Sequence, residues 1–123
     1  MHELNKVIGD LGEEFATQYL IKNNYVVIER NFRCRLGEID IIAKNQRYFC
    51  FIEVKTRHGI YYGTPSQAVN HIKQHKIIMC AQFYISKMKL YEKFNYRFDV
   101  VEIILNTSNE IKNIQLIKDA FQL

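Results

Sequence analysis

Apolar residues recur at steps of three and four along the first part of the chain. They share one stripe of a helix with 3.6 residues per turn, which takes up Leu4, Ile8, Leu11, Phe15 and Tyr19. The pattern predicts an amphipathic helix over residues 3 to about 23.

Three strand-like runs follow this helix. Residues 25–33 are rich in aromatic and β-branched side chains, and residues 37–44 and 48–57 alternate from one face to the other. Asn45-Gln46 separates the second run from the third at the spacing of a two-residue hairpin, and Asn tolerates the positive φ of such turns. The second and third strands are therefore expected to pair antiparallel.

A second helix is predicted from a start signal at residues 64–67. Thr64 suits the N-cap, Pro65 the first helical position and Gln67 the capping box. The helix is expected to reach about residue 88, with a buried stripe made of Ala68, Val69, Ile72, Met79, Cys80 and Phe83.

Two further strands are predicted over residues 97–105 and 110–117, the first almost continuously apolar after Asp99. A strand, a helical crossover and another strand give a parallel pair, so the sheet should be mixed. The predicted fold class is α/β, with about five strands flanked by helices in the order α-β-β-β-α-β-β.

Length and composition narrow the setting. A chain of 123 residues and 14.7 kDa fits one domain, expected to span residues 1–123. Three widely spaced cysteines argue against a disulfide framework or a zinc site. Without a signal-like start or a long apolar run, we expect a cytoplasmic protein with no membrane partner. The net charge of +4 favours an anionic partner, but many proteins of this charge bind no nucleic acid.

Candidate chemistry gathers on the second and third strands. Glu53 and Lys55 are two apart and share a face about 7 Å apart, and Asp40 can join them from the neighbouring strand. Two carboxylates beside one ammonium are costly to bury unless a cation binds between them. Mg²⁺ or Mn²⁺ prefers such oxygen ligands and keeps several waters, so a backbone carbonyl near Val54 would complete the site. The alternative is a surface ion pair of Glu53 with Lys55 and a solvated Asp40.

Such a site predicts phosphodiester hydrolysis. A bound divalent cation polarises a phosphate oxygen and lowers the pKa of a bound water. Lys55 would orient that water or stabilise the charge that develops at phosphorus.

Several short runs occur together in a characteristic order: Gly12-Glu13, Arg30-Asn31-Phe32-Arg33, and residues 37–43, 51–57, 63–65 and 97–100. Together they resemble the bacterial YraN-like family over nearly the whole chain. That family is similar in fold to archaeal Holliday-junction resolvases and to the PD-(D/E)xK nuclease superfamily, which implies a restriction-endonuclease-like fold. The resemblance implies that Glu13, Asp40, Glu53 and Lys55 are catalytic, with the three carboxylates as ligands of Mg²⁺ or Mn²⁺. Helical periodicity itself does not choose between Glu13 and Glu14.

Four polar residues are candidates for binding nucleic acid: Arg33, Arg57, Gln67 and Lys73. Arg57 shares a face with Lys55, and Lys73 lies off the buried helix stripe. Solvated rim positions explain these basic residues about as well, and the capping box explains Gln67. Glu38 shares a face with Asp40 and ranks behind the other acids.

Two residue pairs have structural explanations. His71 and His75 are one helical turn apart, but no third ligand lies near them in sequence, so a solvated helix face is the better interpretation. Arg97 and Asp99 are expected to form an ion pair at the start of the fourth strand.

The favoured function is a metal-dependent nuclease that hydrolyses DNA, with branched or structured DNA as one substrate. A resolvase ordinarily acts as a symmetric dimer, so a homodimer is expected in that case. The alternative is a catalytically inactive module of the same fold that binds nucleic acid or a protein partner. An enzyme acting on another phosphodiester is a third hypothesis, although the chain has no dinucleotide-binding or Walker motif.

Overall fold

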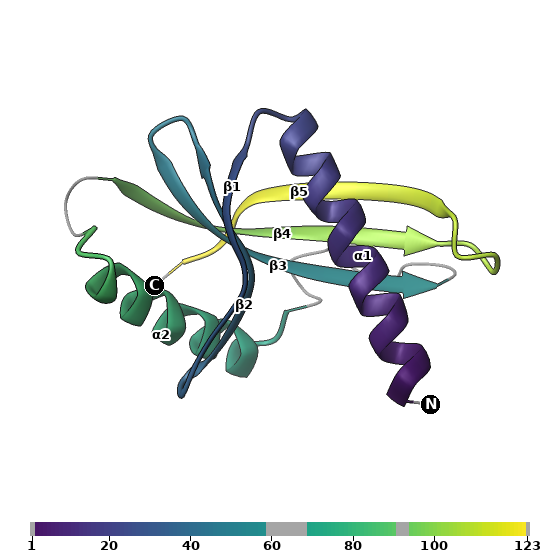
Figure 1. Ribbon diagram of the computed structural model, residues 1–123, viewed down its shortest axis with the longest axis horizontal. Helices are drawn as coiled ribbons and strands as arrows, with labels where there is room; N and C mark the ends of the chain where they lie inside the picture. The colour runs from purple at the N-terminus through teal and green to yellow at the C-terminus, as the bar shows by residue number, and fades with distance from the viewer. Residues whose placement is uncertain (1, 59–68, 91–93, 123) are drawn as a thin grey trace.

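One five-stranded sheet and two helices make up the computed structural model, which describes residues 2–58, 69–90 and 94–122, with helix side chains from residue 7 on (Figure 1). In chain order the elements are α1 His2–Lys22, β1 Val26–Cys34, β2 Gly37–Asn45, β3 Tyr48–His58, α2 His71–Lys87, β4 Asn95–Leu105 and β5 Ile111–Phe121. The strands are ordered β1-β2-β3-β4-β5; β3 and β4 are parallel and the other neighbours antiparallel. The predicted α/β class, element order and mixed sheet are confirmed.

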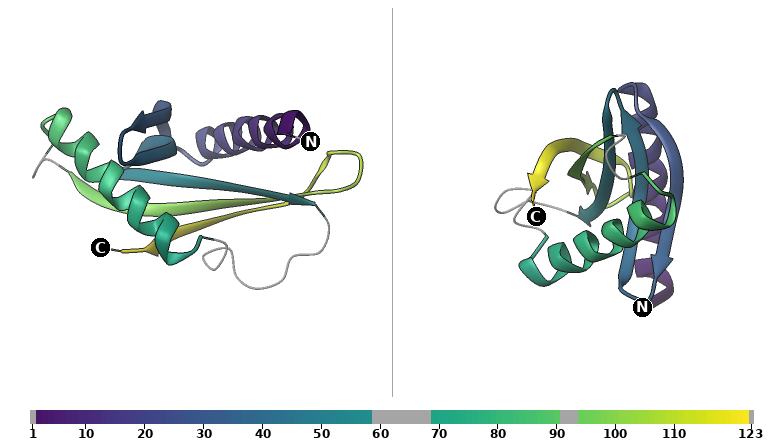
Figure 2. Two further views of the ribbon diagram at one scale, coloured as in Figure 1. Left: turned by 90° about the horizontal axis from the view of Figure 1, so that it is seen from below. Right: turned by 90° about the vertical axis from the view of Figure 1, so that its left-hand side faces the viewer.

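The alternation of side chains along β3 divides the core between the two faces of the sheet. Phe49 and Phe51 belong to a cluster with residues of α2, whereas Cys50 and Ile52 belong to a cluster with Leu20 of α1. In Figure 2, α1 runs lengthwise along the strands, and α2 lies obliquely across the other end of the sheet. Each helix therefore covers its own face.

The most buried side of α1 is not the predicted apolar stripe. Ala16 and Leu20 are fully buried, whereas Phe15 is only half-buried. A Cβ atom built on Gly12 would overlap Oγ1 of Thr56 on β3, so helix and strand approach each other closely there. Gly12, Ala16 and Leu20 therefore lie on the side that contacts the sheet, and Phe15 lies beside it.

Helix α2 differs from its prediction at the start and on its buried face. It begins at His71, with Asn70 as the N-cap: Oδ1 of Asn70 accepts a 2.9 Å hydrogen bond from the Lys73 N–H. The predicted start at residues 64–67 lies outside the described residues, and so does Ala68; Val69 is buried but precedes the helix.

The buried stripe of α2 consists of Ile77, Cys80, Ala81 and Tyr84. Cys80 is as predicted and Met79 is half-buried, but Ile72 and Phe83 are exposed, because the helix rests on the sheet along one narrow line. Within the described part of the chain, no helix is long and apolar enough to cross a membrane.

The hairpin turn between β2 and β3 lies one residue later than predicted. Asn45 pairs with Tyr48, which leaves Gln46 and Arg47 as the turn, and Gln46 adopts the positive φ of 58°. Asn45 is instead buried within β2, where its side-chain oxygen accepts a hydrogen bond from Arg97. This polar contact holds Asn45 inside the strand.

The predicted ion pair between Arg97 and Asp99 is confirmed. Arg97 Nε lies 2.9 Å from Asp99 Oδ1, and the Tyr25 hydroxyl donates to Asp99 Oδ2 and accepts from Arg97 Nη2. The Asp119 N–H donates to the same carboxylate. This buried network joins the start of β1 to the start of β4 and the end of β5.

Candidate active site

Strands β2 and β3 separate at Asp40. Their ladder is paired as far as Ile41 and Ile52. At the next position, Oδ2 of Asp40 accepts a 2.8 Å hydrogen bond from the backbone N–H of Val54. A side-chain carboxylate thus satisfies a strand N–H that a backbone carbonyl would otherwise satisfy, and β2 curves away from β3 (Figure 1).

A cleft of about 540 Å³ includes this point of separation. Residues of α1, β1, β2, β3 and α2 line it, and its charged side chains are Asp10, Glu13, Arg33, Glu38, Asp40, Glu53, Lys55, Arg57 and Lys73. The structure therefore brings the four predicted catalytic residues together in one cleft.

Glu53 lies in this cleft on the α2-facing side of β3 and is only 4% exposed. Its Oε1 is 3.6 Å from Nζ of Lys73, whereas its buried Oε2 has no hydrogen-bond partner among the described residues. Burial, followed by the charge of Asp40, raises the pKa of Glu53 to about 7, against the opposing effect of Lys73 and Lys55. The nearby lysine charges therefore do not fully compensate the negative charge of Glu53.

The negative charge of Asp40 is also incompletely compensated. Burial raises its pKa to about 6, and the charge of Glu13 adds to the effect, while the hydrogen bond from Val54 and the charge of Lys73 act in the opposite direction. Two neighbouring carboxylates with raised pKa values, one of them with a buried oxygen that lacks a partner among the described residues, are suited to a hard divalent cation. Asp40 and Glu53 fit such an ion by chemistry and by position.

Glu13 enters the cleft from α1, whereas Glu14 is exposed and points to Arg30. Oε1 of Glu13 accepts hydrogen bonds from Asn31 Nδ2 at 2.9 Å and from Arg30 Nε at 3.2 Å. Asn31 reaches it from a positive φ of 55° within β1. Of the two acids that periodicity could not separate, Glu13 is therefore the one that lines the cleft.

The described residues contain no group of three His, Cys, Asp or Glu side chains arranged to hold one ion. Asp40 and Glu53 therefore stand as a pair, and Glu13 orders Asn31 and Arg30 beside them. A role for Glu13 as third ligand is carried by the family resemblance alone.

Sequence reasoning missed Glu102. It lies opposite Lys55 in the parallel register of β3 and β4, is 2% exposed, and forms an ion pair with Arg57 at 3.3 Å. Burial raises the pKa of Glu102, while Arg57 and Lys55 lower it. Glu102 thus places a buried carboxylate beside Arg57 at the cleft. The available signal was a single charge within the otherwise apolar run of residues 100–105.

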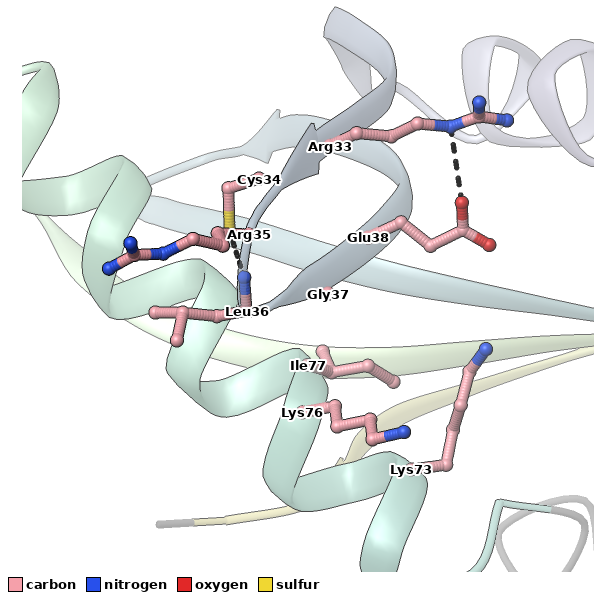
Figure 3. A pocket seen from close by; sticks show the side chains of 9 residues that line it. All are labelled: Arg33, Cys34, Arg35, Leu36, Gly37, Glu38, Lys73, Lys76 and Ile77. Carbon is pink, nitrogen blue, oxygen red and sulfur yellow. Dashed lines mark hydrogen bonds and ion pairs between the residues drawn. The ribbon is translucent and has the colours of Figure 1, made fainter.

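The predicted nucleic-acid-binding residues have separate surroundings. Lys73 projects from α2 into the cleft that contains Asp40 and Glu53, here called the acidic cleft. Arg33 is exposed and paired with Glu38 at 3.2 Å (Figure 3). Arg57 lines the same cleft. Gln67 lies outside the described residues.

The remaining polar candidates do not form a second centre. His71 and His75 are both exposed, as expected for a solvated helix face. Cys34, Cys50 and Cys80 are free cysteines, and Sγ of Cys34 lies 3.2 Å from Sγ of Cys80.

Comparison with known proteins agrees with the motif pattern. The model of the uncharacterised protein family UPF0102 matches residues 12–103, a range that includes Glu13, Asp40, Glu53 and Lys55. A UPF0102 protein of Clostridium kluyveri is 56% identical over 123 residues, which cover 100% of both chains. A UPF0102 protein of Clostridium botulinum strain 657 is 55% identical over the same full lengths. Because matches of this extent show membership, the chain belongs to family UPF0102, the YraN-like family that its motifs resemble.

Proposed function

We propose that the protein is a metal-dependent phosphodiesterase that cleaves nucleic acid, with Asp40 and Glu53 as the ligands of Mg²⁺ or Mn²⁺. One observation carries the proposal. The buried carboxylate of Glu53 and the half-buried carboxylate of Asp40 converge where β2 leaves β3, and Oε2 of Glu53 has no protein partner in the described part of the chain. Lys73 and the Val54 N–H compensate this pair only in part, and such a pair is costly to fold unless a cation completes it.

The residues divide the chemistry between them. A divalent cation bound here would polarise a phosphate oxygen and supply a water of lowered pKa. Asp40 accepts a hydrogen bond from Val54, and Glu53 forms an ion pair with Lys73, so both carboxylates have a fixed contact before a ligand arrives. Lys55 lies on the same face as Glu53 and would orient the attacking water and stabilise negative charge at phosphorus.

The reaction adds the oxygen of water to phosphorus and breaks one bridging P–O bond. The leaving alkoxide takes up a proton, so one phosphodiester gives a phosphomonoester and an alcohol. Arg57 and Lys73 face the same cleft and supply positive charge for the phosphates on either side.

A second candidate function also has an observation in its favour. Lys73 lies 3.6 Å from Glu53 and supplies some of the positive charge that a metal would otherwise provide. In an inactive module, the ammonium group of Lys73 would take the place of the divalent metal ion. The basic residues at the cleft would then bind nucleic acid or a protein without cleaving it.

Cleavage of labelled substrates in Mg²⁺ or Mn²⁺ distinguishes the two. The panel contains single-stranded, duplex, flap and four-way-junction DNA with matched RNA, and compares the wild type with Asp40→Asn, Lys55→Met and the control Lys112→Ala. Lys112 is exposed on β5 and lines none of the clefts described here. We expect metal-dependent cutting by the wild type and the control, reduced by at least about 100-fold in the other two. Absence of cutting by folded protein that still binds nucleic acid would favour the inactive module.

A further inference from the structure

A second cleft lies between the end of the β1–β2 hairpin and α2 (Figure 3). Its volume is also about 540 Å³, and its lining is Arg33, Cys34, Arg35, Leu36, Gly37, Glu38, Lys73, Lys76 and Ile77. Arg33, Glu38 and Lys73 line the acidic cleft as well. The two clefts are therefore adjacent parts of one surface.

The charge of this second cleft is strongly positive. Four cationic side chains line it, and Glu38 is the only acid among its described lining residues. Glu38 is already paired with Arg33. Within the described chain, Arg35 and Lys76 form no ion pair with a carboxylate, and both are exposed. A polyanion would therefore bind Arg35 and Lys76 without breaking an ion pair within the protein.

The β1–β2 hairpin and α2 form the walls of the cleft, and they contact each other before any ligand binds. A Cβ atom added to Gly37 would lie 3.2 Å from the backbone oxygen of Lys76, so the hairpin rests directly on α2. Cys34 and Cys80 are also in contact, with their Sγ atoms 3.2 Å apart. The backbones that carry the cations are therefore fixed relative to each other, which lowers the entropic cost of binding.

Beyond the hairpin end the surface changes character. A hollow of about 430 Å³ lies between Leu36, Phe83 and Lys87 and shares Arg33 and Arg35 with the basic cleft. Phe83 is 45% exposed and Leu36 is 41% exposed. An accessible ring beside basic residues is the combination that binds unpaired bases of any sequence.

We propose that these two hollows bind a single nucleic-acid strand, with its phosphodiester backbone on Arg35 and Lys76 and an unpaired base against Phe83. The inference rests on the proposed function, since it places the neighbouring phosphate of the same strand in the acidic cleft. Arginine favours phosphate through paired N–H donors, and lysine serves as a point charge. The substrate would then be single-stranded, or unpaired next to the cleaved bond.

Binding can be tested without catalysis. Fluorescence anisotropy in EDTA measures the affinity for a labelled single strand and for the duplex of the same sequence over a range of salt concentrations. The variants are Arg35→Ala/Lys76→Ala and Phe83→Ala, and the control is Lys22→Ala/Lys112→Ala. The control removes the same charge from exposed positions outside all three hollows. Circular dichroism melting verifies that each variant is folded.

We expect the wild type and the control to prefer the single strand. The double cleft variant should lose affinity on the order of tenfold and lower the slope of log K against log salt by about 1.4, as for two lost phosphate contacts. Phe83→Ala should lose about tenfold for the single strand with an unchanged salt slope. A double variant that binds like the control, a Phe83 variant that binds like the wild type, or a preference for duplex would each overturn the inference.

The same variants separate this inference from the proposed function. If the protein cuts nucleic acid and the cleft variants bind normally, the strand-binding inference fails and the nuclease stands. If the cleft variants lose binding and the wild type never cuts, the nuclease fails and the binding surface stands.

Discussion

Oδ2 of Asp40 accepts its hydrogen bond from the backbone N–H of Val54, the residue that directly follows Glu53. The contact that opens the sheet therefore also fixes the distance between the two candidate ligands. The polar residue at this position has two separable roles: its oxygen satisfies a strand N–H, and its charge attracts a cation.

Two substitutions of Asp40 separate these roles. Asp40→Asn keeps an oxygen that can accept from Val54 but removes the charge, whereas Asp40→Ala removes both. We expect the free energy of unfolding of the alanine variant to be about 1–2 kcal/mol lower than that of the asparagine variant, because the Val54 N–H loses its acceptor. Urea unfolding in EDTA measures the difference. Equal stabilities would show that the hydrogen bond contributes little to the separation of β2 from β3.

The metal-free protein should become less stable as the pH rises through the range in which Asp40 and Glu53 ionise. Their pKa values are raised in the folded state, to about 6 and about 7, above the ordinary values of 3.8 and 4.5 for Asp and Glu. The folded state therefore binds more protons, and this stabilising contribution is complete below about pH 4 and lost as pH rises through about 6 to 7.

Chemical unfolding in EDTA between pH 5 and about 8 tests this dependence. The Asp40→Asn/Glu53→Gln variant should show a smaller fall in stability than the wild type over that range. Mg²⁺ should raise the stability of the wild type at the upper end, since binding to the folded state alone stabilises it. A wild type and variant with parallel pH curves would show that the two carboxyl groups ionise normally.

The contact between α1 and β3 predicts opposite effects for two glycine substitutions in the same helix. Gly12→Ala places a Cβ against Thr56, so we expect a loss of about 1–3 kcal/mol in the free energy of unfolding. Gly9→Ala meets no atom within 4 Å and should gain up to about 1 kcal/mol from helix propensity. Thermal unfolding of both variants provides the comparison. Stabilisation by both would mean that the helix and strand can move apart without cost.

In the buried network at the start of β4, loss of the Asp99 charge should destabilise the protein more than loss of the Tyr25 hydroxyl. Asp99→Asn leaves Arg97 buried without its carboxylate and should cost about 3–5 kcal/mol, whereas Tyr25→Phe should cost about 1–2 kcal/mol. Guanidinium unfolding of the two variants measures both losses. Similar small losses in both would argue that solvent reaches Arg97 when Asp99 is replaced.

Periodicity predicted the strand faces well because a strand has only two of them. The assignment of Glu53 and Lys55 to one face followed directly from their spacing, and the β2–β3 hairpin brought Asp40 near them. The turn was misplaced by one residue because Asn45 is held in β2 by Arg97, a residue 52 positions away. Such distant contacts leave no trace in local spacing.

The same limit applies to the helices. The burial of Glu13 depends on Asn31 and Arg30 of β1, and the narrow buried stripe of α2 depends on how obliquely the helix crosses the sheet. Glu102 differs, because a charged residue within an apolar strand is visible in the sequence and indicates a buried partner. Charges that interrupt apolar runs therefore merit the same scrutiny as recognised motifs.

Binding of one divalent cation by Asp40 and Glu53 can be measured by isothermal titration calorimetry with Mn²⁺ and Mg²⁺. The titrations compare the wild type with Asp40→Asn, Glu53→Gln and the control Glu38→Gln, whose carboxylate lines the same cleft but is paired with Arg33. We expect one saturable site per chain in the wild type and in the control, and none in the other two variants. A folded wild type that binds neither cation, or binding that survives both substitutions, would contradict it.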